Sequence, residues 1–390
     1  MARDAATPSL PERLAARIRR DGPISFSDFM AAALYDETDG YYSRPQRKVG
    51  QKGDFFTSVS VGPLFGSLLA RRFLRHWRDI GRPKAWRIVE CGAHDGTLAR
   101  DVLNSLATLD AACLAGLEYC TIEPSEFLRA RQHETLSGFH DVVRIMPAPE
   151  PIDDPPPGLI FGNEVLDALP CDAVEWRDRQ WWLRCVDCDD AMKFGWTLKP
   201  MENDELAACL EQPGDRFPEG YRTEIRTNYG GFLQPLLSMV REALMLWIDY
   251  GFARDDYYSP LRNEGTLRAY ARHAASDDVL QDPGASDLTA HVDFTTLAET
   301  AHALGAEVIE FRNQGAWLTE LARDWLLSME NQPKPADLRA FQTLAHPAQL
   351  GAKFHAIELS WDRKLSAADS ARISRHLGID PSSTTHLRVI

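Results

Sequence analysis

The sequence predicts an α/β fold: a Rossmann-like, mostly parallel sheet of seven strands, with helices at the N-terminus and a small inserted antiparallel subdomain. Short apolar runs alternate with helically spaced segments along most of the chain, which is typical of βαβ units whose helices cover both faces of a sheet. A glycine-containing loop follows the first of these runs, and alternating polar and apolar residues interrupt the series after the fourth. Together they indicate one α/β core with an insertion.

The first part of the chain, residues 1–82, is expected to form a helical extension that carries an active-site loop. Apolar residues at three- and four-residue spacings predict helices over residues 11–34 and 63–77. Glycines punctuate the segment between these helices, from residue 40 to residue 55, and indicate a loop.

Seven short apolar runs predict the strands of the central sheet. They lie at residues 87–90, 117–123, 142–146, 159–161, 244–249, 306–311 and 354–359. Helical spacing follows or separates them at residues 98–109, 317–329 and 336–344. We therefore expect the core to comprise residues 83–170 and 228–390.

Residues 171–227 are expected to form the inserted, β-rich subdomain. Its first two alternating segments flank a short polar turn, which predicts an antiparallel hairpin, and two further segments extend that hairpin into a small sheet. The four segments are residues 173–176, 181–186, 194–198 and 221–226.

Composition argues against several classes of function. The 390 residues include 43 Lys and Arg against 57 Asp and Glu, a net charge of -14, and a surface of that sign repels phosphate backbones. We therefore expect no nucleic-acid partner. No window of about 18 apolar residues occurs, so no membrane span is expected either.

The predicted location is cytoplasmic. The seven cysteines are irregularly spaced, which fits free thiols in a reducing compartment. The N-terminus has no apolar signal core, and Asp4 and Glu12 argue against a mitochondrial presequence. Cys185 and Cys188 form a Cys-x-x-Cys pair, but no second pair has suitable spacing, so we expect no metal site.

The loop from Glu90 to Leu98 is the first candidate site. It follows the first strand of the parallel sheet, where nucleotide-like ligands bind in open α/β sheets. Gly92 and Gly96, on either side of Ala93, have no Cβ, so the backbone there allows a ligand to approach closely. A dinucleotide fingerprint would need a glycine in place of His94, which disfavours NAD. The alternative is a plain strand-to-helix turn.

Glu123 and Pro124 end the second strand and form the second candidate site. A carboxylate at this position can accept hydrogen bonds from both hydroxyls of a ribose, as in dinucleotide-binding folds. The alternative is a solvated charge at the end of a strand. The glycine loop at the end of the neighbouring strand favours the ribose interpretation.

Glu164 and Asp167 follow Asn163 at the end of the fourth strand and form the third candidate site. If a helical turn begins there, two acids three residues apart share one face. Such a pair can hold a guanidinium by bidentate hydrogen bonds and orient it for attack on a sulfonium methyl group. The alternative is an N-terminal helix cap with an acid that complements the helix dipole.

Several of these stretches, taken in order with others, resemble a known family. The matching blocks are Gly22-Pro23-Ile24, Gly40-Tyr41-Tyr42, Gly53 to Ser58, Phe65-Gly66, Glu90 to Leu98, Asn163 to Pro170, Asp249-Tyr250-Gly251, Gly265 to Arg268, Asp282-Pro283-Gly284 and Asp287 to Phe294. The series covers the chain from about Gly22 to Leu359. It is similar to the MidA family of S-adenosylmethionine-dependent methyltransferases, which includes the mitochondrial complex I assembly-factor arginine methyltransferase.

The resemblance implies a class I methyltransferase fold, S-adenosyl-L-methionine as cofactor and S-adenosyl-L-homocysteine as product. It implies that Asn163 and Glu164 face the methyl group, and we expect Glu164 and Asp167 to be the catalytic residues that orient the acceptor. It implies that Glu90, Gly92, Gly96 and Glu123 bind the cofactor and that Asp54, Phe55, Thr57 and Ser58 form a loop that closes over the site. We expect Ala93, Pro124 and Asn163, which adjoin these residues, to contact the cofactor as well. The implied methyl acceptor is an arginine of a partner protein, such as a respiratory-complex subunit, and a homodimer is compatible with the sequence.

The chain departs from the family pattern at two places near the site. His94 replaces a glycine, so a side chain stands where backbone is expected to approach the cofactor. Val59-Ser60 replaces Pro-Glu, which removes a carboxylate. These departures motivate one alternative function, a non-catalytic assembly or binding protein that keeps the fold. The other alternative is a small-molecule methyltransferase with the insertion as a lid.

Overall fold

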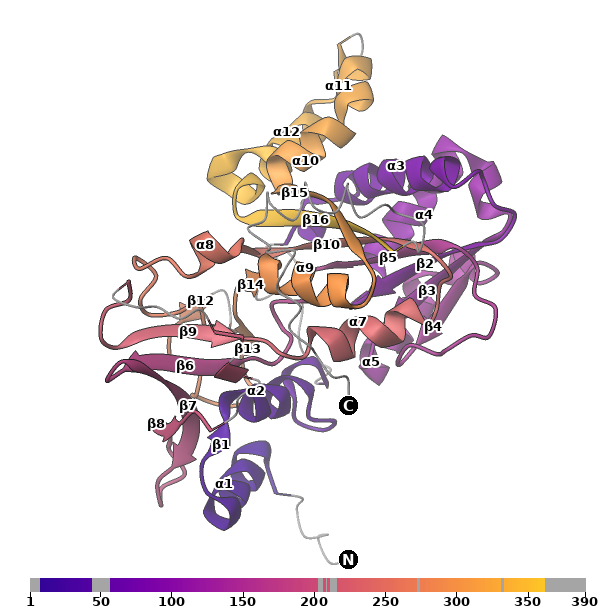
Figure 1. Ribbon diagram of the computed structural model, residues 1–390. Coiled ribbons are helices and arrows are strands. Elements are labelled where there is room, and N and C mark those ends of the chain that lie inside the picture. Colours follow the sequence, from indigo (N-terminus) through magenta and orange to yellow (C-terminus); the bar gives the residue numbers. More distant parts are fainter. Residues whose placement is uncertain are drawn as a thin grey trace, which may run out of the picture.

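The central feature of the computed structural model is a twisted sheet with helices on both faces (Figure 1). The structure describes residues 8–43, 57–202, 206–207, 209–210, 216–271, 274–330 and 333–361. Around the sheet lie two smaller sheets and the N-terminal helices, which pack at one side of the core (Figure 1). Asp54 and Phe55, two predicted site residues, lie outside the described ranges.

All seven predicted strands of the central sheet are confirmed. They are β2 (Trp86–Cys91), β3 (Leu117–Ile122), β4 (Val143–Met146), β5 (Gly158–Asn163), β10 (Ala243–Phe252), β15 (Glu307–Asn313) and β16 (Phe354–Trp361). Their order is β15-β16-β10-β5-β2-β3-β4, and the short β14 (Val292–Asp293) pairs with the end of β10. Strands β10, β5, β2, β3 and β4 run parallel, whereas β16 is antiparallel to both β10 and β15. The prediction of a mostly parallel sheet is therefore correct.

Two hydrophobic clusters cover the two faces of this sheet. One cluster joins α3 (Leu64–Asp79), α4 (Thr97–Leu109), α10 (Gln314–Leu321), α11 (Arg323–Met329) and α12 (Pro335–Ala345) to the sheet. The other joins α7 (Tyr229–Leu237) and α9 (Phe294–Ala303) to the opposite face. All six residues of β2 are buried, as expected for a parallel strand covered on both sides.

The N-terminal segment differs from the continuous helical pattern that was predicted for residues 11–34. Helix α1 (Leu10–Asp21) ends at Gly22, and α2 (Phe26–Tyr35) begins after the two-residue strand β1 (Ile24–Ser25). Pro23 between them lacks a backbone N–H and favours an extended residue before it, which separates the two helices. The Ser25 hydroxyl then accepts a hydrogen bond from the Asp28 N–H, at 3.0 Å, and caps α2.

The inserted segment forms the predicted antiparallel sheet. Its strands are β6 (Asp172–Arg177), β7 (Gln180–Cys188), β8 (Phe194–Pro200) and β9 (Tyr221–Ile225), in the order β7-β6-β9 with β8 also paired to β7. Strand β1 pairs with β7 through Ile24 and Val186, so the N-terminal segment contributes a strand to this sheet. The domain boundaries at residues 82, 170 and 227 stay predictions.

Three short strands lie between Tyr257 and Asp293, a stretch for which no strand was predicted. They are β11 (Arg268–Ala271), β12 (Ala274–Ser276) and β13 (Asp287–Thr289), with β11 in the middle. Each is too short to show a clear alternation of polar and apolar residues, which explains why the pattern did not reveal them. Helix α8 (Arg254–Tyr257) immediately precedes this segment.

Within the described ranges, none of the helices has both the length and the apolar character that crossing a membrane requires. Over the same part of the chain, no cluster of three or more His, Cys, Asp and Glu side chains has an arrangement that would hold a metal ion.

Candidate active site

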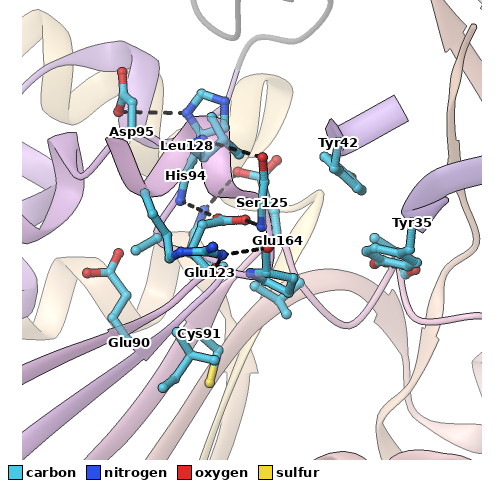
Figure 2. Close-up of a pocket in the computed structure, with 18 of the residues that line it drawn as sticks. Tyr35, Tyr42, Glu90, Cys91, His94, Asp95, Glu123, Ser125, Leu128 and Glu164 are labelled. Carbon is cyan, nitrogen blue, oxygen red and sulfur yellow. Dashed lines mark hydrogen bonds and ion pairs between the residues drawn. The ribbon is translucent and has the colours of Figure 1, made fainter. Parts of the chain in front are cut away.

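A cavity of about 1490 Å³ opens at the carboxyl ends of β2, β3 and β5 (Figure 2). The strand order reverses between β2 and β5, and ligands of open α/β sheets bind at such a position. The cavity is lined by nine of the residues that were predicted from the sequence: Thr57, Glu90, Gly92, Ala93, Glu123, Pro124, Asn163, Glu164 and Asp167. The structure thus brings together side chains from three strand ends.

The loop after β2 depends on two glycines. Gly92 has φ 64°, and a Cβ at this position would lie 2.8 Å from Cγ2 of Val165 in the neighbouring loop. Gly96 has φ 80° and precedes the first turn of α4. Both backbone conformations are costly for residues with a side chain. The loop therefore keeps open backbone facing the cavity and places the N-terminus of a helix beside it.

His94, which stands where the family pattern has a glycine, lines the cavity. Its φ is 48°, and its Nδ1 lies 3.7 Å from Oδ1 of Asp95 at the edge of the site (Figure 2). Its backbone N–H donates to Oε2 of Glu123 at 3.2 Å, and its carbonyl accepts from Gln132 at 2.7 Å. The backbone of His94 thus connects the glycine loop to the end of β3.

Glu123 is buried, and each of its carboxylate oxygens accepts one backbone N–H. Oε2 accepts from His94, and Oε1 accepts from Ser125 at 3.0 Å. Because a carboxylate oxygen can accept about two hydrogen bonds, both oxygens retain capacity for hydroxyl donors. Burial raises the pKa of Glu123 above its ordinary value, although the hydrogen bonds from the two N–H donors partly oppose this rise. These groups fit the ribose of a nucleoside cofactor, and Gly92 fits its close approach to the backbone. The predicted site residue Gly96 does not line the cavity, because a Cβ there would lie 3.1 Å from Cδ1 of Leu136.

Glu90 lies deeper in the same half of the cavity. Its side chain is buried, and its Oε2 accepts a hydrogen bond from the Tyr119 hydroxyl at 2.5 Å. Burial raises the pKa of Glu90 to about 8. The carboxyl group can therefore take up a proton near neutral pH, depending on the charge of the bound ligand.

The segment after β5 is not the helical turn that was predicted for Glu164 and Asp167. Glu164 has φ 54°, which is the left-handed region and breaks any helix at this point. The Asn163 side chain donates to Oε1 of Glu164 at 2.9 Å. Burial and the charge of Asp167 raise the pKa of Glu164 to about 8, against hydrogen bonds from Asn163, Ser58 and Tyr250. The two acids therefore interact, but by loop geometry rather than by helical spacing.

Asp249, at the end of β10, fixes this loop and was missed as a site residue. Its Oδ2 accepts three successive backbone N–H groups, those of Val165, Leu166 and Asp167, at 3.1, 2.8 and 3.2 Å. Its Oδ1 accepts the N–H of Tyr250 at 2.8 Å. An acid that ends a run of buried apolar residues was the available signal in the sequence.

Arg226, just beyond β9, holds the far end of the same loop. Its buried guanidinium donates to the carbonyls of Asp167 and Leu169 at 2.7 and 3.0 Å. It also donates to the carbonyls of Ala290 and His291 at 2.8 and 2.7 Å. Arg226 thereby links the loop after β5 to the segment between β13 and β14. No pattern in the sequence indicated this role.

Ser58 and Thr57, predicted as part of a closing loop, have different surroundings. The Thr57 hydroxyl lies 3.0 Å from that of Ser60, and Thr57 lines the cavity. Ser58 is buried, and its hydroxyl donates to Gln314 on α10 at 3.1 Å. The Ser58 side chain therefore faces the helices, and only its backbone interacts with Glu164.

Two tyrosines from the N-terminal segment line the cavity and were not predicted as site residues. The hydroxyl of Tyr35, the last residue of α2, donates to the carbonyl of Ala168 at 2.9 Å. The hydroxyl of Tyr42 donates to Oδ1 of Asp287 at 2.9 Å. Figure 2 shows both tyrosines on the side of Glu164 away from His94. Tyr42 belongs to one of the blocks that carry the family resemblance, which was the available signal.

The chain is similar to a known protein family and to known proteins and structures. A family model described as "Putative S-adenosyl-L-methionine-dependent methyltransferase" matches residues 68–312. The mitochondrial protein arginine methyltransferase NDUFAF7 of Homo sapiens is 27% identical, over 96% of this chain and 88% of that protein. Its homologue in Drosophila melanogaster is also 27% identical, over 89% of this chain and 83% of that protein.

One solved structure is similar over nearly the whole chain. It is a Burkholderia thailandensis protein crystallised with S-adenosyl-homocysteine, which is 33% identical and superimposes with a TM-score of 0.81. The similarity covers 93% of this chain and 94% of that one. The fold that the sequence predicted is therefore shared with a protein that holds this ligand.

The predicted cytoplasmic location is contradicted by the comparison, because the curated relatives are named as mitochondrial proteins. The seven free cysteines that supported the prediction indicate a reducing environment. Such an environment does not by itself identify one compartment, so the inference from thiols to cytoplasm was wrong.

Proposed function

This chain belongs to the family of S-adenosyl-L-methionine-dependent methyltransferases, and we propose that it methylates an arginine nitrogen of a partner protein. Methyl transfer with S-adenosyl-L-methionine as cofactor follows from membership of the family. The choice of arginine rests on the site and on the names of the relatives, which are arginine methyltransferases.

The observation that carries the proposal is the pair of carboxyl groups beside the cofactor half of the cavity. Glu164 and Asp167 both line the cavity, and the charge of Asp167 is one reason why the pKa of Glu164 is raised. Two acids so placed stabilise a cation between them. A planar guanidinium, which has several N–H donors, can bond to both carboxylates at once better than an ammonium, which is a compact point charge. An arginine side chain therefore fits this half of the cavity.

Different residues of the site bind the cofactor, orient the acceptor and accept a proton. Gly92 and Glu123 hold the cofactor, while Glu164 and Asp167 orient the acceptor. When bound, S-adenosyl-L-methionine supplies a methyl group on a sulfonium, and the C–S electron pair returns to sulfur as the acceptor nitrogen takes the methyl. The nitrogen must lose one proton. Glu164 accepts it, because pairing with the cationic guanidinium favours the deprotonated carboxylate before transfer, and its pKa of about 8 in the free site lets it hold the proton afterwards.

Peptide methylation followed by mass spectrometry tests this proposal. The purified protein is incubated with S-adenosyl-L-methionine and a set of peptides that differ only in one central residue, arginine, lysine or citrulline. We expect a mass increase of one methyl group on the arginine peptides alone. Transfer to lysine, or to none of the three peptides, would contradict the assignment of arginine.

The Glu164→Gln variant tests the role of the carboxylate in the same assay. It keeps the size of the side chain and an acceptor for the Asn163 amide, so we expect its calorimetric affinity for S-adenosyl-L-homocysteine to match that of the parent. Its rate of transfer should fall by about 100-fold or more, the usual contribution of a positioned general base. Unchanged turnover would remove Glu164 from the catalytic role.

A further inference from the structure

The cavity has a second half that the cofactor groups leave unexplained. Pockets that bury a ligand of ordinary size have volumes of about 300–1,000 Å³, and this cavity has about 1490 Å³. Beyond Glu164, its wall is formed by elements outside the central sheet: the end of α2, the turn η1 (Tyr41–Ser43) and strand β13. The side chains there include Tyr35, Tyr42 and Asp287.

Hydrogen bonds fix the two tyrosines in this wall. Tyr35 donates to the Ala168 carbonyl, and Ala168 belongs to the loop that carries Glu164. Tyr42 donates to Asp287 on β13. The centres of the two rings lie 5.6 Å apart, with an angle of 31° between their planes. Because each hydroxyl is tethered to a different element, both aromatic faces are held in place before any substrate binds.

The charge of the cavity favours a cation. Two basic side chains are present among the lining residues that the structure describes, those of His94 and Arg129, and the Arg129 guanidinium already donates to the carbonyls of Glu123 and Pro124. Eight lining residues are acidic: Glu37, Glu90, Asp95, Glu123, Glu126, Glu164, Asp167 and Asp287. The charges of Asp287 and Asp167 act on both tyrosines, since each raises the pKa of Tyr35 and of Tyr42 in addition to the effect of burial.

We propose that Tyr35, Tyr42 and Asp287 form a recognition wall that selects the guanidinium of the acceptor over an ammonium. A planar guanidinium stacks on aromatic rings and offers N–H donors to a carboxylate at its edge, whereas an ammonium is a compact point charge that is more strongly hydrated. The wall and Glu164 then contact the acceptor from two sides. This inference rests on the proposed function, because it names the residues that give the same site its substrate preference.

Steady-state kinetics on the arginine and lysine peptides test the recognition wall. Tyr42→Leu removes one aromatic face, and we expect KM for the arginine peptide to rise about 5- to 30-fold, the equivalent of one desolvated cation–π contact. Tyr42→Phe keeps the ring and loses the bond to Asp287, so its KM should rise less. Asp287→Asn should also raise KM for the arginine peptide. It should therefore reduce the ratio of kcat/KM for the arginine peptide to kcat/KM for the lysine peptide. Calorimetric affinity for S-adenosyl-L-homocysteine should stay at the parent value in all three variants.

A matched control removes an aromatic ring elsewhere. Trp182 lies on β7 outside the cavity, and its indole N–H donates to the Arg177 carbonyl, so Trp182→Leu should leave KM unchanged. If the parent methylates arginine and the tyrosine variants keep the parent KM, the recognition wall is wrong and the proposed function stands. If the parent prefers lysine, or transfers to no peptide, the proposed function is wrong and the wall is overturned with it. A loss of S-adenosyl-L-homocysteine affinity in Tyr42→Leu would also overturn the wall as an acceptor site.

Discussion

Glu164 shows how one residue combines strained backbone, burial and charge. Its left-handed φ of 54° is uncommon for a residue with a long side chain, and strain of this kind clusters at functional sites. The conformation turns the chain sharply after β5 and leaves the carboxyl group in the cavity beside Asn163. A helical turn would have placed Glu164 and Asp167 on one outer face instead.

The raised pKa of Glu164 predicts a pH dependence of transfer. Below its pKa of about 8 the carboxyl group of the free enzyme is mainly protonated, so it can neither pair with a guanidinium nor accept a proton. We therefore expect kcat/KM to rise up to tenfold per pH unit below about pH 8 and to level off above it. A pH series on the arginine peptide measures this. A flat profile between pH 6 and 9 would contradict it.

The hydrogen bonds of Asp249 predict that its loss lowers both stability and catalysis. In Asp249→Asn an NH₂ group replaces one of the two carboxylate oxygens, and an NH₂ group cannot accept a hydrogen bond. Either the N–H of Tyr250 or the three N–H groups of the loop therefore lose their acceptor. We expect the free energy of unfolding to fall by about 1–3 kcal/mol, the cost of buried donors without a partner. Because the loop carries Glu164, transfer should fall by at least tenfold. Denaturant titration and peptide kinetics measure the two effects, and an Asp249→Asn variant with parent kinetics would show that the loop is held without this carboxylate.

At the scale of elements, the glycine loop after β2 predicts the strength of cofactor binding. Gly92→Ala would place a methyl group 2.8 Å from Cγ2 of Val165 and require φ 64° from a residue with a side chain. The strain is about 1–2 kcal/mol, so affinity for S-adenosyl-L-homocysteine should fall about tenfold. Gly138→Ala is the matched control, because nothing lies within 4 Å of a Cβ at that position. Equal affinities of the two variants in calorimetry would contradict the prediction.

The elements differ in how far the sequence could predict them. Every residue of β2 is buried, and four of its six residues are apolar, the exceptions being Arg87 and Glu90. A short, mainly apolar segment before a glycine loop made the position of this strand clear from the sequence. Glu123 was predicted because the glycine loop at the end of the neighbouring strand favoured the ribose interpretation over a solvated charge at the end of a strand. By contrast, the loop after β5 is shaped by Asp249 and Arg226, which are distant in sequence. Local spacing carries no information about such partners, so the predicted helical turn was wrong.

At the scale of the whole molecule, the active site depends on the N-terminal helices. Phe29 of α2 is fully buried, packs against Phe26 and Phe194, and thereby anchors the helix that ends in Tyr35. The same helix follows β1, which is paired with β7. Packing of the N-terminal segment on the inserted sheet therefore determines where Tyr35 lies.

Phe29→Ala tests this dependence. Loss of a buried phenylalanine should lower the free energy of unfolding by about 3–5 kcal/mol in denaturant titration. If α2 positions Tyr35, KM for the arginine peptide should rise at a temperature where the variant is still folded, with little change in calorimetric affinity for S-adenosyl-L-homocysteine. Leu261→Ala, at a position that is 95% exposed, should change neither quantity. A variant that loses stability but keeps the parent KM would show that α2 does not position the site.

The place of β16 between β10 and β15 has a consequence for biosynthesis. Its residues are the last that the structure describes, and Phe354 and His355 pair with Tyr250 and Asp249 at the end of β10 that borders the active site. A ribosome that adds about 5–20 residues per second needs roughly 5–20 s to pass from the end of β10 to the start of β16. During that interval the nascent chain presents an unpaired apolar strand edge, which is a hazard for aggregation. The nascent chain therefore gains its complete sheet only after β16 has been translated, and a product that stops before Phe354 cannot complete it.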